Sequence, residues 1–428
     1  MNVLKIALLG TAALAAVSVS ARADDLADLK AQIEALNGRI SQLESTPSIP
    51  AGFQLLTVSE ADAIIVPGVE VDKEYGTKAT NIGILPTADV PASTNIQWSG
   101  FVRVGIVSES GKSRIDRFTK ATGVTVVGGV QPSIKADSID VVSRAGIKVV
   151  GTTETAVGEV GVRVALLATV EGFDNRSHDS AVATDGYWGW WKMTPELTLA
   201  GGVDGSLANS SNAFDNRCSC AYIGTGGAFG HGDPTQIRLS YASGPISFAI
   251  ALEDEANRID AFGYSQKSAF GVAGEMKYAG DTIGFDLNAG YWDSVQAGAN
   301  GDSAWTVNAG ANMGLGDIAS LGLAIGVGED SHFSGSVDRY TKASMFLGFT
   351  LSDSVSAEFG GAYTDYKGNS STYTVAGGLY YTPVSQLTLG LEASYGKAKN
   401  VVTAEIPTEF HRTSSNLTVV DAIAIWRF

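Results

Sequence analysis

The sequence predicts an all-β protein, a transmembrane antiparallel β-barrel of about sixteen strands that is preceded by a short α-helical coiled coil. Three observations predict this fold. From residue 95 onward, apolar residues alternate with polar ones, as they do along β-strands. Short turns alternate with long connections, which is typical of outer-membrane barrels. The chain also ends on a strand pattern with an aromatic residue, Phe428, whereas the termini of most domains fray.

Composition is compatible with one large closed β structure. The chain has 428 residues, 51 glycines, 17% charged residues and a formal net charge of −16, and its mean hydropathy is +0.10. The acidic balance argues against nucleic acid as a partner. After the first 25 residues, no stretch holds the 18 or more apolar residues that a transmembrane helix needs.

Four segments are predicted: a signal peptide (1–23), a periplasmic coiled coil (24–45), a linker (46–94) and the barrel (95–428). The signal has a basic start at Lys5, an apolar run and a small-residue cleavage pattern that ends at Ala23. A retained helix is the alternative, but the apolar run is short and rich in alanine.

The coiled coil is predicted from apolar residues that recur at spacings of three and four, the heptad pattern that makes helices supercoil. These residues are Leu26, Leu29, Ile33, Leu36, Ile40 and Leu43. The segment "RISQLE", Arg39 to Glu44, resembles the trimer-forming motif of coiled coils. A helix this short is marginal alone and needs tethered partners. The alternative is an amphipathic helix that lies on its own protein.

The linker carries five prolines and no heptad pattern, so it reads as an extended, irregular connector. Three paths are left open: the linker is disordered, lies along the periplasm, or enters the barrel. The two cysteines, Cys218 and Cys220, are too few for a disulfide framework. The pair has three possible interpretations: a strained local disulfide, a metal site with His231, or a plain loop feature. We expect the loop feature and no metal or other cofactor.

The strand pattern is clearest in "QLTLGLEASY", where Leu387, Leu389 and Leu391 face one way and Glu392 the other. Sixteen such strands are predicted, at 95–106, 139–150, 156–169, 186–193, 197–204, 235–242, 245–253, 268–278, 281–292, 303–313, 320–328, 339–351, 355–366, 371–381, 386–397 and 415–428. The long connections are expected at 107–138, 170–185, 205–234, 254–267 and 398–414. An even strand number places both chain ends on the short-turn side, which is the periplasmic side.

A bilayer offers no water to backbone groups, so a membrane sheet must close on itself with an apolar outer face. The rival fold is a soluble two-sheet sandwich. Three observations argue against it. The strands are about ten residues long, their inward side chains are polar, and aromatic residues lie near the strand ends, where the membrane interfaces would be. The rings are Tyr291, Tyr340, Tyr363 and Tyr395 toward the long loops, and Tyr381 and Trp426 toward the short turns.

Strand parity predicts a basic wall inside the barrel, because a charge on the lipid face would cost roughly 2–4 kcal/mol at mid-membrane. The inward basic residues are Arg103, Arg144, Lys148, Arg163, Lys192 and Arg238, with Glu159 beside them. A barrel of sixteen strands is wide enough for an aqueous channel. Loop 205–234, folded inward, would narrow it and set Asp204, Asp215 and Asp233 against the basic wall.

These features together resemble the trimeric sixteen-stranded general porins of Gram-negative bacteria. The stretch "IQWSGFVRVGIV" is similar to the first strand of the alphaproteobacterial members. The resemblance covers about 95–428 and implies passive diffusion of small hydrophilic solutes and ions through each monomer of a homotrimer. It also implies that Trp426 and Phe428 form a signal for the outer-membrane assembly machinery. The coil and linker depart from the simplest members.

The implied partners are other copies of the chain, outer-membrane lipid and lipopolysaccharide, the assembly machinery and, for the coil, peptidoglycan. Two alternatives stay open: a substrate-selective porin, and a porin that also tethers the outer membrane to the cell wall. An enzyme is not expected, because the four histidines all fall in predicted long loops without a recognisable catalytic motif. Ion preference is left open, since the net charge favours cations and the basic wall favours anions.

One feature of the last strand does not fit a wet lumen. Its inward face carries Asp421 and Arg427, but also the apolar residues Ile423 and Ile425. Contact with the linker and packing low in the barrel are the two explanations left open.

Overall fold

The computed structural model describes residues 56–69, 73–84, 94–121, 124–130, 134–170, 182–217, 233–254, 270–292, 304–330, 338–367, 370–406 and 409–428. The predicted signal peptide, the coiled coil with its seam Leu26 to Leu43, and the two cysteines lie outside these residues. In the described part, no helix is long and apolar enough to cross a membrane.

The described residues form nineteen strands, one short α-helix and one 3-10 helix. The strands are β1 (Leu56–Asp62), β2 (Lys78–Ile84), β3 (Thr94–Ala121), β4 (Val124–Val130), β5 (Ile134–Thr155), β6 (Gly158–Val170), β7 (Val182–Lys192), β8 (Leu197–Val203), β9 (Thr235–Ser243), β10 (Ile246–Asp254), β11 (Phe270–Ala279), β12 (Ile283–Trp292), β13 (Ala304–Leu315), β14 (Ala319–Asp330), β15 (Asp338–Ser352), β16 (Val355–Tyr366), β17 (Ser370–Val384), β18 (Leu387–Ile406) and β19 (Glu409–Arg427). The helices are η1 (Lys73–Tyr75) and α2 (Phe214–Arg217).

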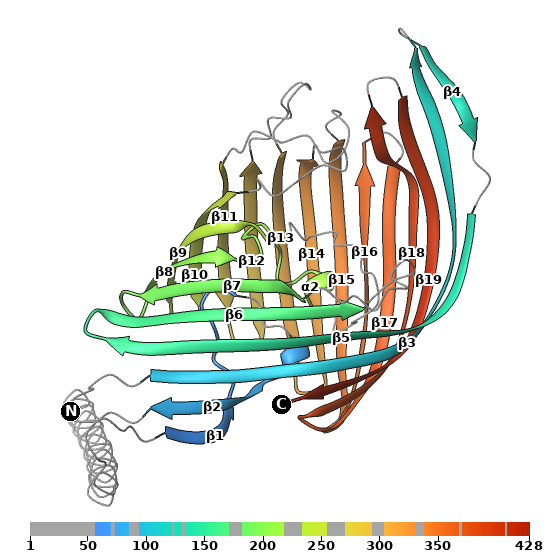
Figure 1. Ribbon diagram of the computed structural model, residues 1–428. Coiled ribbons are helices and arrows are strands. Elements are labelled where there is room, and N and C mark those ends of the chain that lie inside the picture. The colour runs from blue at the N-terminus through green and yellow to red at the C-terminus, as the bar shows by residue number, and fades with distance from the viewer. Residues whose placement is uncertain are drawn as a thin grey trace, which may run out of the picture. The chain divides into compact units, whose positions relative to one another are not determined.

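Sixteen of these strands, β3 and β5 to β19, close an antiparallel barrel in the described part of the chain. Each of these strands pairs with its neighbour in sequence, and β19 returns to pair with β3 (Figure 1). At the seam, Gly100 and Phe428 exchange both backbone hydrogen bonds, at 3.1 and 3.2 Å. Closure removes the unpaired strand edges that a bilayer would not tolerate.

The barrel exposes apolar side chains on its outer face and buries polar ones on its inner face, which is the reverse of a soluble β protein. Along β12, exposed and buried residues alternate without exception. The exposed ones include Phe285 and Leu287, whereas the buried ones include Asp286 and Asn288. The same outward apolar set recurs on the other strands, for example Phe248, which is 49% exposed. An exposed apolar surface of this extent marks contact with lipid or protein, so the barrel is built for a membrane and the sandwich is excluded.

All sixteen predicted strands are present, with differences at their ends. The first short turn lies at residues 156–157, and not between the predicted strands 139–150 and 156–169, because β5 continues to Thr155. Two predicted long loops, 107–138 and 398–414, are mostly strand. There β3, β5, β18 and β19 lengthen, and β4 pairs with β3 (Figure 1). His411 therefore lies in a strand, and not in a loop. These extensions carry mixed polar residues, so the apolar alternation that predicts a membrane strand is missing from them.

Most of the predicted interfacial aromatics lie on the outer face. Tyr291, Tyr363, Tyr381 and Trp426 are each about half exposed. Tyr340 is an exception and corrects the prediction, since it points inward, is buried, and its hydroxyl lies 3.1 Å from the Thr306 hydroxyl.

The described part of the linker forms a hairpin, and not an irregular connector. Strand β1 pairs with β2, which pairs with the start of β3 through Thr80 and Trp98. The chain between the two strands includes η1, and Tyr75 of η1 packs edge-to-face on Phe101 with ring centroids 5.0 Å apart. Tyr75, Phe101, Ile423 and Ile425 form one buried cluster. Of the explanations left open for the two inward isoleucines, contact with the linker is therefore the one found.

Candidate pore lining and constriction

The predicted basic wall lies on the inner face of neighbouring strands. Arg103 is on β3, Arg144 and Lys148 are on β5, Arg163 is on β6, Lys192 is on β7 and Arg238 is on β9. Arg103, Arg163 and Arg238 are buried among inner-face groups, whereas the Lys192 side chain is 37% exposed. The apolar neighbours in sequence, such as Val102 and Val164, are exposed on the outer face. The six residues therefore lie on the face opposite to these exposed apolar side chains.

Each arginine or lysine of this wall has an anionic or aromatic neighbour. Arg163 lies 2.8 Å from the Asp204 carboxylate, and Lys192 lies 2.8 Å from Glu159. The Lys148 ammonium stands 4.5 Å from the Tyr75 ring centroid, within cation–π range. A partly buried charge is costly unless it is paired, so these contacts hold the wall charged.

The segment after β8 runs along the opposite inner wall. Glu253 of β10 holds its first turn, because the carboxylate accepts hydrogen bonds from the Ser206 hydroxyl, the Leu207 backbone and the Trp292 indole. These distances are 3.0 to 3.1 Å. Glu253 has no exposed surface. A buried carboxylate with three donors is a strong anchor.

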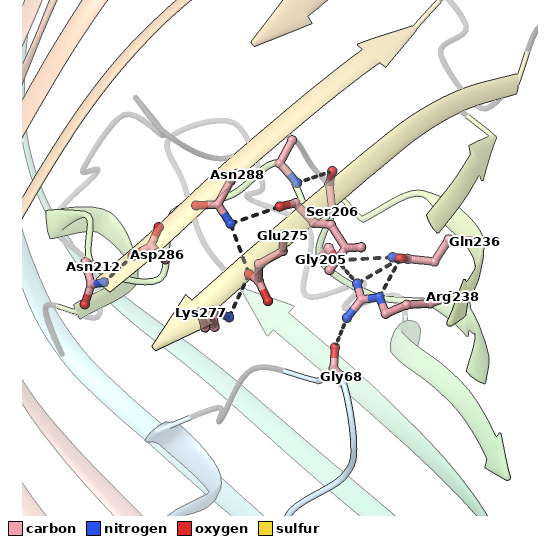
Figure 2. Close-up of polar contacts among 12 residues, drawn as sticks. Gly68, Gly205, Ser206, Asn212, Gln236, Arg238, Glu275, Lys277, Asp286 and Asn288 are labelled. Carbon is pink, nitrogen blue, oxygen red and sulfur yellow. Dashed lines mark hydrogen bonds and ion pairs between the residues drawn. The ribbon is translucent and has the colours of Figure 1, made fainter. Parts of the chain in front are cut away.

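Further contacts attach the segment to the inner face of the barrel. Asn288 donates to the Leu207 carbonyl, and Asn212 donates to the Asp286 carboxylate (Figure 2). Phe214 of α2 is fully buried with Phe346, Ala362 and Ala376, which lie on β15, β16 and β17. Residues 205–217 thus form an inward loop, which confirms the first half of the predicted one.

Arg238 joins the inward loop to the linker. Its guanidinium donates to the Gly205 carbonyl at 2.8 Å and also to the Gly68 carbonyl (Figure 2). The side chain is held by Gln236 and stands over the Trp188 ring. Gly68 has φ +79°, and a Cβ there would lie 2.9 Å from the guanidinium. This close approach therefore requires glycine.

The predicted acidic loop residues have different placements. Asp204 is the first residue after β8, and burial raises the pKa of its carboxyl, although Arg163 acts in the opposite direction. Asp233 is exposed just before β9. Asp215 lies in α2, but its side chain is outside the described atoms, as are residues 218–232. Of the three aspartates, the structure brings Asp204 to the basic wall.

Sequence reasoning missed the acidic inner face of the later strands. It comprises Glu253, Asp286, Glu358, Glu392 and Asp421, on β10, β12, β16, β18 and β19. Glu392 and Asp421 are register partners, and the Tyr380 hydroxyl donates to Glu392 at 2.9 Å. Parity already placed Glu392 and Asp421 inward, so the signal was present. These carboxylates lie among inward basic residues of neighbouring strands, such as Lys277 of β11 and Lys342 of β15.

Comparison with known proteins agrees on the fold. No protein-family model and no curated protein matches the chain. Among solved structures, it is similar to the outer membrane channel DcaP of Acinetobacter baumannii (TM-score 0.53, 13% identity, covering 80% of this chain and 99% of that one). It is also similar to an anion-selective porin from Comamonas acidovorans (TM-score 0.51, 13% identity, 77% and 100%). At these identities the likeness shows the fold.

Proposed function

We propose that the protein is an outer-membrane porin, a water-filled channel for passive diffusion of small hydrophilic solutes and ions. The observation that carries this proposal is the reversal of faces: apolar side chains point out of a closed sixteen-strand barrel, and charged ones point in. Water in the lumen accounts for this charged lining, because charged side chains are far more stable beside water than in an apolar surrounding. The similarity in fold to two outer-membrane channels supports the same function.

Diffusion through this pore is testable with purified full-length protein in liposomes. We expect liposomes to swell in neutral sugars, at rates that fall as the sugar grows, because the inward loop and the linker occupy part of the lumen. Liposomes with heat-denatured protein are the control. Swelling equal to this control would contradict the proposal.

Location and assembly follow as proposals from the same architecture. The short turns, the start of β3 and the end of β19 share one side of the barrel, which would face the periplasm. The terminal Phe428, hydrogen-bonded to Gly100, would serve with Trp426 as the assembly signal. The heptad seam would join three copies. Removing residues 24–45 should therefore reduce the number of chains in the purified assembly while single channels still conduct, and an unchanged number of chains would contradict the role of the coil.

A further inference from the structure

Two arginines of the basic wall stand directly opposite each other on paired strands. Arg103 of β3 and Arg144 of β5 are register partners. Like charges in this position destabilise a sheet, because the side chains are neighbours on one face. A pair of this kind needs a shared anion, or its charge stays uncompensated.

The shared anion comes from the linker. The Glu74 carboxylate divides between the two guanidinium groups: one oxygen contacts Arg103 Nη1, and the other lies 3.1 Å from Arg144 Nη1. Glu74 lies in η1, between the hairpin strands β1 and β2. It therefore belongs to the linker and not to one of the sixteen barrel strands, although its side chain reaches their inner face.

Glu74 is held in place by its own backbone and by its neighbours. Arg427 Nε donates to the Glu74 carbonyl at 2.8 Å, and Tyr75 is buried against Phe101. Nearer the start of the linker, the Trp188 indole donates to the Pro67 carbonyl at 2.9 Å. Lys73 also reaches the inward loop, through the Arg217 carbonyl. The linker therefore contacts the basic wall and the inward loop together.

The cluster is open to solvent on one side. The Arg144 side chain is 26% exposed and Glu74 13%, whereas Arg103 is 1% exposed. Asp185 stands 3.9 Å from Arg144 on the same side and is 21% exposed. An ion in the lumen therefore approaches an Arg144 guanidinium that is already in contact with the Glu74 carboxylate.

We propose that Glu74 is a selectivity-determining residue of the pore, and that the linker thereby contributes one negative charge to this point of the barrel wall. The proposal rests on the proposed channel function. The Glu74 carboxylate compensates one of the two arginine charges, in addition to Asp185 beside Arg144. Without Glu74, the wall gains one net positive charge, and the lumen admits anions more readily.

Reversal potentials across a planar bilayer with a KCl gradient test the proposal. Glu74→Gln keeps the side-chain size and removes the charge. We expect its chloride-to-potassium permeability ratio to rise about twofold to threefold over the wild type, as expected for one charge acting through water at several ångströms. Glu74→Asp keeps the charge, so its permeability ratio should differ from the wild-type ratio much less than that of Glu74→Gln does. Arg144→Gln should move the ratio in the opposite direction.

The matched control is Glu60→Gln, which removes an exposed carboxylate from β1 of the same hairpin. It should leave the permeability ratio unchanged. A wild type that conducts while Glu74→Gln keeps the wild-type ratio would overturn this inference and leave the channel function intact. A shift of equal size in Glu74→Asp would also overturn it, since a displaced loop would then explain the change. Absence of conductance in every variant would overturn both proposals.

Discussion

The Arg163 guanidinium lies 2.8 Å from the Asp204 carboxylate, and this contact joins the middle of β6 to the first residue of the inward loop. Both side chains are largely buried, at 6% and 12% exposure. The pair fixes where the loop leaves β8, and it also cancels a charge on the basic wall. Structure and ion preference therefore depend on the same two residues.

Acidification should raise the preference for anions. Burial raises the pKa of Asp204 above the usual value of an aspartate, so the carboxylate takes up a proton at a higher pH than an exposed one would. As the pH falls through that pKa, Asp204 loses its charge while Arg163 keeps its own. The chloride-to-potassium permeability ratio, measured from reversal potentials between pH 7 and pH 4, should therefore rise.

Asp204→Asn should show the raised ratio already at pH 7 and a flatter pH profile. Asp281→Asn, which alters an exposed carboxylate in the turn before β12, should keep the wild-type profile. A wild-type ratio that falls on acidification would contradict the assigned role of the Arg163–Asp204 pair.

Phe214→Ala should loosen the inward loop. Phe214 has no exposed surface and packs on three inner-wall residues, and removing a buried phenylalanine costs about 3–5 kcal/mol. We expect a larger and noisier single-channel conductance. Phe359→Ala, on the outer face of β16, serves as the control because Phe359 is half exposed. Identical recordings from the two variants would show that Phe214 does not hold the loop.

Glu253→Gln should weaken the other end of the loop. An amide has one oxygen where the carboxylate has two, so its nitrogen would face a donor from Ser206, Leu207 or Trp292. Losing one such bond costs about 1–3 kcal/mol, which corresponds to roughly fivefold to 150-fold more frequent opening. Native-state proteolysis of the folded barrel should show faster cleavage in the loop. Glu154→Gln, at an exposed position beside the first turn, should not change the cleavage rate.

Adjacent positions on β6 test the assignment of faces. Val164 points outward and is 45% exposed, whereas Arg163 points inward. Val164→Lys should cost roughly 2–4 kcal/mol in the membrane, and the fraction of protein that folds into lipid vesicles should drop. Arg163→Lys keeps a charge on the inner face and should fold like the wild type. Equal folding yields would mean that β6 does not cross the membrane in this orientation.

Much of the barrel follows from periodicity, because lipid on one side and water on the other impose opposite requirements on successive residues. The inward assignment of Arg144 and the common outward face of Leu389 and Leu391 needed nothing more. The strand extension around His411 did not follow, since the apolar alternation of a membrane strand is missing there. Tyr340 was misplaced because a tyrosine at a strand end fits either face, and its hydroxyl contact with Thr306 was not visible in the sequence.

The constriction was only half predictable. Gly, Ser and Asn with a long connection indicated an inward loop, but the residues that anchor it, such as Glu253, belong to distant strands. Nothing in the proline-rich linker indicated that Glu74 reaches the basic wall. The sequence held one indication of this contact, the apolar pair Ile423 and Ile425 on a face that should contact water. Their buried contact with Tyr75 of the linker explains why they are apolar. Apolar residues on an inner face therefore deserve a search for a segment that covers them.

The central claim is that this barrel encloses an open aqueous path. Single-channel recording of the purified full-length protein in a planar bilayer tests it most directly. We predict stepwise insertions with a stable open state whose conductance rises with KCl concentration, because ions cross through water in the lumen. A folded, membrane-inserted barrel that gives no current steps at any salt concentration would contradict the account.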